Sequence, residues 1–179
     1  LSEINIDNLK NLTNIYLPEN QLTKVQISNL PKLEYLNLHA NDLAEINLRN
    51  VDGLKTLDIR NNRISNLDLE AIPNIEQLQL GVNLFKEFSI ENLKLIKELY
   101  LNNNKLTTFN IPLEHSIERL DLGVNLLEFF TPKETRNLIN LNIERNNLSE
   151  ISLLSYNNLE RFKANNNLFD FLDFSMCPK

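Results

Sequence analysis

The sequence predicts a solenoid of short stacked coils with a parallel β-sheet on one face. Three observations predict this fold: a triplet of apolar residues returns every 21 residues, an asparagine follows each triplet at a fixed distance, and no insertion or deletion breaks the period. A chain of 179 residues is long enough for one domain with a sizeable core. Only three glycines occur and no Gly/Ser-rich stretch, so we expect residues 1–179 to form a single solenoid without a linker.

The apolar triplet, spaced apolar-x-x-apolar-x-apolar, defines the repeats. Residues 1–11 form the end of an earlier repeat, and eight repeats begin at positions 12, 33, 54, 75, 96, 117, 138 and 159. Alternate residues of a strand face the same side, so the last two apolar residues of each triplet point inward. Stacked coils then pair these strands in parallel, about 4.8 Å apart, and we expect this sheet to form the concave face.

An asparagine stands three residues after every triplet. A buried amide both donates and accepts, so it can bond backbone groups that a turn leaves unpaired. We therefore predict a structural asparagine ladder along the turn, made of Asn20, Asn41, Asn62, Asn83, Asn104, Asn125, Asn146 and Asn167.

A second copy of the apolar spacing follows within each repeat, as in Leu22, Val25 and Ile27. The full pattern L-x-x-L-x-L-x-x-N-x-L resembles the leucine-rich repeat family, and its nested form is similar to the bacterial 21-residue class called IRREKO. The resemblance implies right-handed coils, short extended or 3-10 segments on the convex face, and little or no α-helix. Pro132 replaces an apolar residue of the second motif, and we expect it to interrupt pairing there, because proline cannot donate a ladder hydrogen bond.

The outward positions of the concave strands are the predicted binding surface of such a fold. Three columns hold 24 residues, of which four are basic and four acidic, so the face is near neutral. That balance suits a protein or peptide partner. Tyr16 and Tyr35 lie on adjacent strands and form either a binding patch or a cross-strand pair that stabilises the sheet. The predicted partner-binding residues are Tyr16, Tyr35, Asn37, Asp58, Arg60, Tyr100, Arg119, Asp121 and Lys163.

A longer period of 42 residues overlies the repeat. After the ladder asparagine, one repeat type carries a polar residue and then Ser or Thr, and the other carries Leu and then a charge, with the second repeat conforming only in part. These leucines either tuck against the neighbouring turn or form an exposed stripe for a partner. The candidate apolar stripe comprises Val82, Leu84, Val124, Leu126, Phe129, Leu168 and Phe171.

The composition excludes several function classes. A net charge of −6 and a pI near 5.0 argue against nucleic acid as a partner. No apolar run reaches the roughly 18 residues of a membrane span. His39 and His115 belong to no cluster with metal-ligand spacing, and Cys177 occupies an apolar repeat position, so we expect a core thiol rather than a nucleophile. We predict no enzymatic activity and no cofactor.

The function predicted from these features is that of a protein-interaction module. The resemblance favours a bacterial surface or secreted effector protein, with a secreted or cell-surface location. Two alternatives remain: the recognition domain of a larger effector enzyme, and a eukaryotic receptor ectodomain. Residues 1–11 begin within a repeat, so we expect a fragment of a longer protein, and an apolar end or edge of the solenoid is a candidate for self-association.

Overall fold

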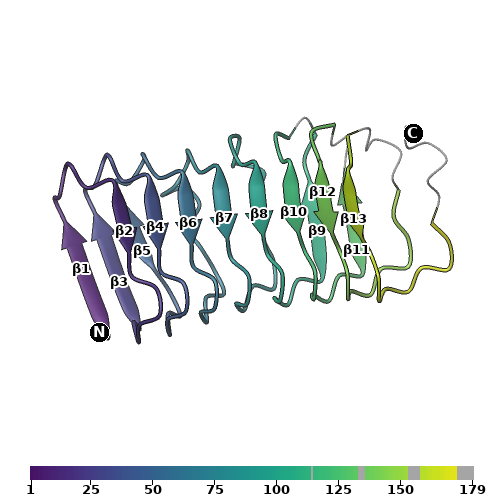
Figure 1. Ribbon diagram of the computed structural model, residues 1–179, viewed down its shortest axis with the longest axis horizontal. Helices are drawn as coiled ribbons and strands as arrows, with labels where there is room; N and C mark the ends of the chain where they lie inside the picture. Colours follow the sequence, from purple (N-terminus) through teal and green to yellow (C-terminus); the bar gives the residue numbers. More distant parts are fainter. Residues whose placement is uncertain (114, 133–135, 153–157, 173–179) are drawn as a thin grey trace.

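The computed structural model describes residues 1–113, 115–132, 136–152 and 158–172. The chain forms a solenoid of parallel strands whose coils follow one another along a nearly straight axis (Figure 1). Within these residues there is no helix of any kind, and hence none long and apolar enough to cross a membrane. The predicted fold class is confirmed, and the described residues of the convex face contain strands in some coils and no 3-10 segment.

Eight strands form one continuous parallel sheet, which we call the front sheet. Its neighbouring strands pair with an offset of 21 residues, as in Leu36 with Leu57 and Leu57 with Leu78, so the register does not slip between coils. In chain order the strands are β2 (Asn14–Tyr16), β4 (Tyr35–Asn37), β6 (Thr56–Asp58), β7 (Gln77–Gln79), β8 (Glu98–Tyr100), β10 (Arg119–Asp121), β12 (Asn140–Asn142) and β13 (Arg161–Lys163).

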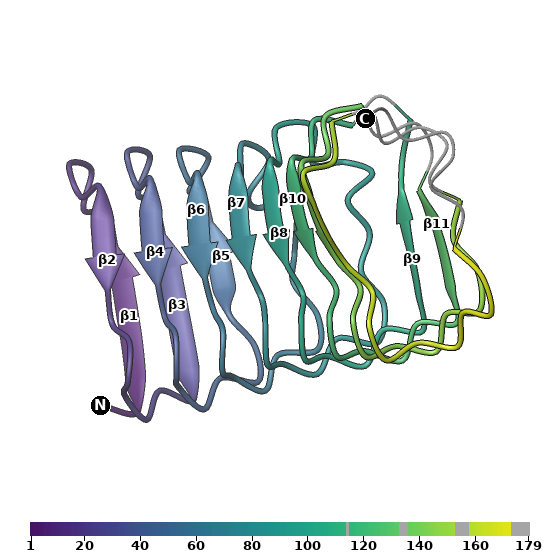
Figure 2. The same ribbon diagram turned by 45° about the vertical axis from the view of Figure 1, so that its right-hand side comes forward.

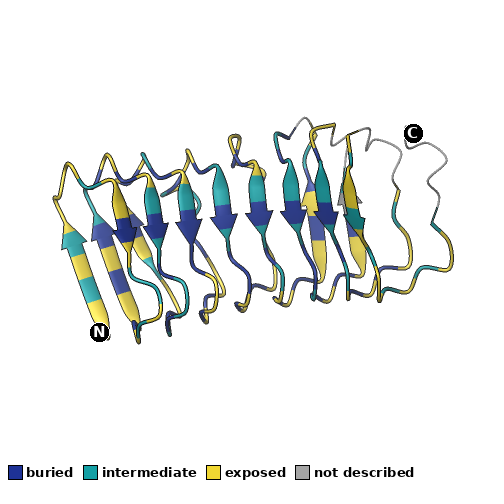
Figure 3. Cartoon of the chain, viewed as in Figure 1, coloured by how far each residue is buried: buried dark blue, intermediate teal, exposed yellow. Residues whose placement is uncertain are grey.

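The core runs the length of the solenoid between the front sheet and the back. Leu33, Leu36 and Leu38 of one triplet are fully buried, and the equivalent residues of the next five coils are buried as well. Most front strands have a buried centre between more exposed flanks, visible as blue bands on the arrows in Figure 3, whereas β6 also buries Asp58 and the centre of β13 is only partly buried. Burial of this apolar column is the main stabilising term, at about 1.5–3 kcal/mol for each large side chain.

The back of the solenoid is less regular and carries two separate parallel sheets (Figure 2). One contains β1 (Glu3–Asp7), β3 (Lys24–Ser28) and β5 (Asn47–Arg49), and the other contains β9 (Thr108–Ile111) and β11 (Phe129–Pro132). The coils between them form no back strand. Glu70 and Glu91 occupy equivalent positions in these successive coils, and like charges placed opposite each other disfavour strand pairing.

The expectation that Pro132 interrupts pairing is wrong on the side that faces β9. Pro132 pairs with Ile111 as the last residue of β11. At the end of a strand the missing N–H terminates the ladder instead of breaking it, which is why proline is accepted there.

A left-handed residue precedes every ladder asparagine, with φ between 52° and 57° at all eight positions. This conformation lets the chain turn away from the front sheet within two residues. Asparagine tolerates it, but two of the positions carry a β-branched side chain, for which positive φ is strained. The eight residues are Glu19, Ala40, Asn61, Val82, Asn103, Val124, Arg145 and Asn166.

Candidate functional site

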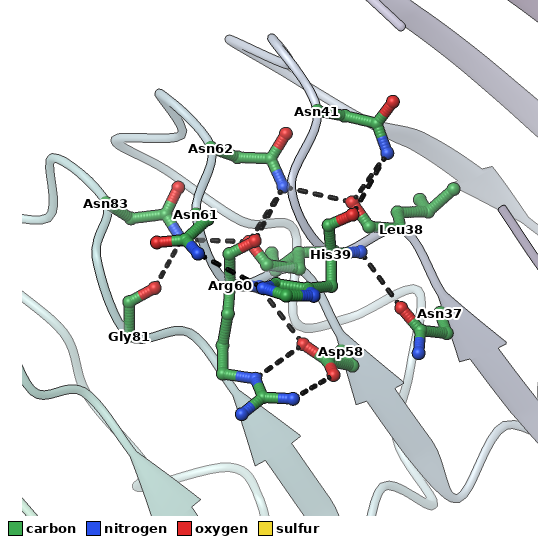
Figure 4. Close-up of polar contacts among 11 residues, drawn as sticks. Asn37, Leu38, His39, Asn41, Asp58, Arg60, Asn61, Asn62, Gly81 and Asn83 are labelled. Atoms are coloured by element: carbon green, nitrogen blue, oxygen red, sulfur yellow. Dashed lines mark hydrogen bonds and ion pairs between the residues drawn. The ribbon is translucent and has the colours of Figure 1, made fainter. Parts of the chain in front are cut away.

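The ladder asparagines tie each coil to the one before it. Nδ2 of Asn83 donates to the carbonyl oxygens of Leu80, 3.1 Å away in its own coil, and Ile59, 2.9 Å away in the preceding coil. Its Oδ1 accepts the N–H of Ile64 at 3.0 Å. The inner rungs repeat this pattern, and Figure 4 shows three of them in succession, from Asn41 to Asn83. These side-chain amides form hydrogen bonds within the scaffold, so they are not available to a ligand.

The two tyrosines of the first front strands are in ring contact, and Tyr16 is exposed while Tyr35 is half-buried. The rings of Tyr16 and Tyr35 lie 4.9 Å apart between centroids, with their planes at 31°. Tyr16 remains 61% exposed. The two interpretations of this pair are therefore compatible, since a stacked pair can also present an open aromatic surface.

Asp58 lies beneath Arg60 and does not face the solvent directly. Its side chain is 2% exposed, and Arg60 closes over it with two side-chain hydrogen bonds, Nε to Oδ1 at 3.0 Å and Nη2 to Oδ2 at 2.7 Å (Figure 4). The bond to Asp58 raises the pKa of Arg60. A partner at this point of the front face would meet the guanidinium and not the carboxylate.

Asn37 and Asp58 also shape the end of their strands. Each accepts the backbone N–H two residues further on, at His39 (2.9 Å) and Arg60 (3.1 Å) respectively, and so closes a turn after the strand. The His39 ring in turn contacts the Asn61 amide, with 3.1 Å between Nε2 and Nδ2 (Figure 4).

Glu98 is the centre of a polar network on the middle of the front sheet. Its carboxylate accepts the Tyr100 hydroxyl at 2.9 Å, the Gln77 amide at 2.8 Å and Nη1 of Arg119 at 2.7 Å. Burial, followed by the bond to Glu98, raises the pKa of Tyr100 to about 12. The network holds a tyrosine and an arginine in fixed positions on neighbouring strands.

Asp121, another carboxylate of the front face, is partly buried. Burial raises its pKa, although hydrogen bonds from the Gly123 N–H (2.9 Å) and the Asn142 amide (3.0 Å) act in the opposite direction. Asp121 borders a cavity of about 180 Å³ together with Lys163 and the other residues of the last front strands. The structure thus brings Tyr100, Arg119, Asp121 and Lys163 of the predicted set together.

Two glycines leave notches at the edge of the front face, a feature that the sequence analysis missed. A Cβ on Gly81 would lie 2.7 Å from Oδ1 of Asn102, and one on Gly123 would lie 2.8 Å from Nδ2 of Asn142. A side chain at either glycine would displace the neighbouring asparagine side chain. The notch at Gly81 opens into a depression of about 490 Å³ that His39 and Arg60 also line. Glycine alternates with larger residues in one column of the sequence, and this alternation could have revealed the depression.

The apolar stripe is exposed for most of its length. Leu84, Leu126 and Leu168 are 38%, 48% and 63% exposed, whereas Val124 is half-buried. Phe129 and Phe171 on the back are 62% and 77% exposed. These leucines do not tuck fully against the neighbouring turn.

The described residues hold no group of three or more His, Cys, Asp or Glu side chains placed to bind a metal ion. His115 is buried, its Nε2 lies 3.2 Å from the Ile90 carbonyl oxygen, and burial lowers its pKa. The Nδ1 atom has no hydrogen-bond partner within the same residues. Cys177 lies outside the described part of the chain.

Comparison with known proteins supports the repeat assignment. The family model described as Leucine Rich Repeat matches residues 53–75. The leucine-rich repeat protein LIC12759 of Leptospira interrogans is similar in structure, with a TM-score of 0.82 and 28% identity over 92% of this chain and 45% of that one. No curated protein sequence matches the chain.

Two further solved structures share the fold at lower identity. YopM from Yersinia enterocolitica has a TM-score of 0.70 and 23% identity, covering 93% of this chain and 41% of YopM. A chain of the LRIM1/APL1C complex has a TM-score of 0.78 and 22% identity, covering 93% of this chain and 35% of that one. The chain spans about half the length, or less, of the structures it matches. With its 21-residue register and asparagine ladder, the chain has the repeat pattern and the fold of leucine-rich repeat proteins.

Proposed function

We propose that the chain is a non-enzymatic protein-interaction module that binds a protein or peptide on its front sheet. One observation carries the proposal: the solvent side of the eight-stranded sheet presents an open aromatic pair and charges of both signs, with no bulky segment of the described chain over them. Leucine-rich repeat proteins bind protein partners, and one compared structure is itself a protein complex. Nucleic acid is a poor fit to this face, because its charges balance.

The fixed side chains of the front sheet support tight recognition. Arg60 is held on Asp58, and Arg119 and Tyr100 are held on Glu98. Tyrosine and arginine are the residue types that most often anchor protein interfaces. Because internal hydrogen bonds already restrict these side chains, a partner loses less conformational entropy in ordering them.

We propose a bacterial setting, at the cell surface or as a secreted effector. The 21-residue repeat resembles a bacterial class, and two of the compared structures come from Leptospira and Yersinia. A recognition domain of a larger enzyme is the alternative, as is a receptor ectodomain. The flanking sequence distinguishes them, since the enzyme alternative requires an adjoining catalytic domain.

The exposed stripe is a second candidate surface, suited to self-association along the edge of the solenoid. Its exposed leucines recur every second coil, so two copies could bring matching rows together. Sedimentation of the wild type beside a Leu84→Gln/Leu126→Gln variant tests this: an unchanged monomer for both would remove the proposal.

Binding on the front sheet is tested by affinity capture with paired variants. Substituting Tyr16, Tyr35 and Tyr100 by alanine removes the aromatic anchors of the front face. Lys24→Ala/Gln26→Ala is the matched control, because both residues are exposed on a strand of the back. The proposal expects the tyrosine variant to lose a captured protein that the wild type and the control retain. Equal recovery by all three proteins would overturn it.

A further inference from the structure

Strand β9 on the back of the solenoid has an open edge. It pairs with β11 on one side, while its other side faces residues 86–91 of the preceding coil. No described strand pairs with that edge, and no backbone hydrogen bond joins β9 to residues 86–91. Figure 2 shows β9 and β11 well apart from the other back strands.

The register identifies the backbone groups on the open edge. The Glu128 N–H donates to the Thr107 carbonyl at 2.9 Å. In a parallel ladder the N–H and C=O of one residue point to the same side, and the side alternates along the strand. Residues 107, 109 and 111 therefore face β11, which leaves the amide and carbonyl groups of Thr108 and Asn110 on the open edge. Pro112 follows and has no N–H to offer.

A groove of about 590 Å³ runs beside this edge. Phe88, Phe109, Leu113 and Phe129 form its apolar walls, and the side chains of Leu113 and Phe129 are 60% and 62% exposed. A segment lying in the groove would bury these side chains, and apolar burial on this scale favours binding.

The charged residues that line the groove are both acidic. They are Glu87 and Glu91, and none of the lining residues that the structure describes is basic. Neither carboxylate forms an ion pair with another described residue. An occupant that places cationic side chains at these two points would complement them, whereas an acidic occupant would be repelled.

We propose that this groove binds an extended, basic segment of a partner protein, which adds a strand to the open edge of β9. Four residues of β9 define a pairing length of about 13 Å. Backbone hydrogen bonds to Thr108 and Asn110 supply the register, and alternate side chains of the segment reach the phenylalanines and the glutamates. The site lies on the opposite side of the solenoid from the front sheet, so this proposal can be tested independently of the front-face proposal.

Amide hydrogen exchange tests the open edge itself. In the free protein, the Thr108 and Asn110 amides should exchange faster than those of Phe109 and Ile111, which face β11. Equal protection of all four amides would show that the edge is already paired and would overturn the proposal.

Binding is tested with an acetylated and amidated peptide of about eight alternating lysine and valine residues, a length that covers β9 with overhang. The wild type should bind it about tenfold more tightly than a peptide with glutamate in place of lysine, and Glu87→Gln/Glu91→Gln should remove most of that preference. Equal binding of the two peptides would refute the charge argument.

Two further comparisons isolate strand addition. Asn110→Pro removes one N–H from the open edge without taking a donor from the β11 ladder, and Asn110→Ala keeps that N–H. The proposal expects the proline variant to bind the lysine peptide at least about fivefold more weakly than the alanine variant. A lysine peptide N-methylated at alternate amides provides the same test on the wild-type protein, if proline disturbs folding. Unchanged affinity in both comparisons would overturn the proposal.

Discussion

Replacing Asn83 by alanine should destabilise the chain strongly, because this buried amide joins two coils. Asn83 satisfies the N–H of Ile64 and the carbonyls of Ile59 and Leu80, in two coils. Alanine leaves all three buried groups without this partner. The Ile64 N–H is then unsatisfied, at a cost of about 1–3 kcal/mol. The two carbonyls keep one donor each, because Asn62 still donates to Ile59 and Asn104 to Leu80. The expected decrease in the free energy of unfolding is about 2–4 kcal/mol, which includes the two lost carbonyl contacts.

The first rung of the ladder provides an internal control. Asn20 donates only to Leu17 and Pro18 of its own coil and is partly exposed. We expect Asn20→Ala to cost about 1 kcal/mol, the usual contribution of a net hydrogen bond. The assay is equilibrium unfolding in urea, followed by far-ultraviolet circular dichroism, on the wild type and both variants. A loss of equal size at the two positions would refute the claim that the bonds between coils carry the stability.

Asn83→Asp separates hydrogen bonding from cavity formation. The carboxylate keeps the volume and the acceptor for Ile64, but it turns an oxygen toward two carbonyl oxygens. At neutral pH this variant should lose at least as much stability as Asn83→Ala. Protonation restores one donor, and the site holds the pKa of the introduced carboxyl above its unfolded value, so stability should recover as the pH falls.

Three other measurements follow from the structure. Val82→Asn should stabilise the chain by about 1 kcal/mol, because asparagine tolerates the left-handed conformation that a β-branched residue resists, and a loss of stability in thermal unfolding would contradict that reasoning. Burial lowers the pKa of His115, so on acidification the unfolded state takes up a proton before the folded state does. The free energy of unfolding should therefore decrease as the pH falls below about 6.5. His115→Gln should flatten that decrease. The Tyr100 hydroxyl should ionise near pH 12 in a spectroscopic titration, and because its folded pKa is raised, stability should decrease as the pH rises above about 10; Glu98→Gln should bring the ionisation to lower pH.

The columns of the solenoid could be predicted because they depend on period alone. A triplet every 21 residues places Leu36, Leu57 and Leu78 in one buried row, whatever the turns between them do. The front sheet and the position of the ladder follow from the same periodicity. Exposure of the stripe could not be predicted in this way, since a leucine beside a turn can point either way.

Local backbone conformation could not be predicted from the sequence where the fold overrides the preference of the residue. The residue before each ladder asparagine is left-handed even where it is glutamate, alanine or valine, because the turn imposes the geometry on a variable side chain. Strand alternation places Asp58 on the outer side, yet Arg60, two residues along on the same side, closes over it. Pairing on the back varies from coil to coil while the apolar repeat does not, so the repeat alone could not predict it.

In a regular repeat, each residue can be compared with the equivalent residues of the other coils, so a residue that departs from its column is informative. Most polar residues of the front face have an internal role: Asn37 closes a turn, Glu98 collects three donors, and the ladder joins coils. A residue that departs from its column and has no such internal role needs another explanation. Phe129 stands where the neighbouring coils carry Thr108 and Glu150, and no core contact requires it, since its side chain is largely exposed. Its presence beside an unpaired strand edge therefore favours a role in binding over a role in folding.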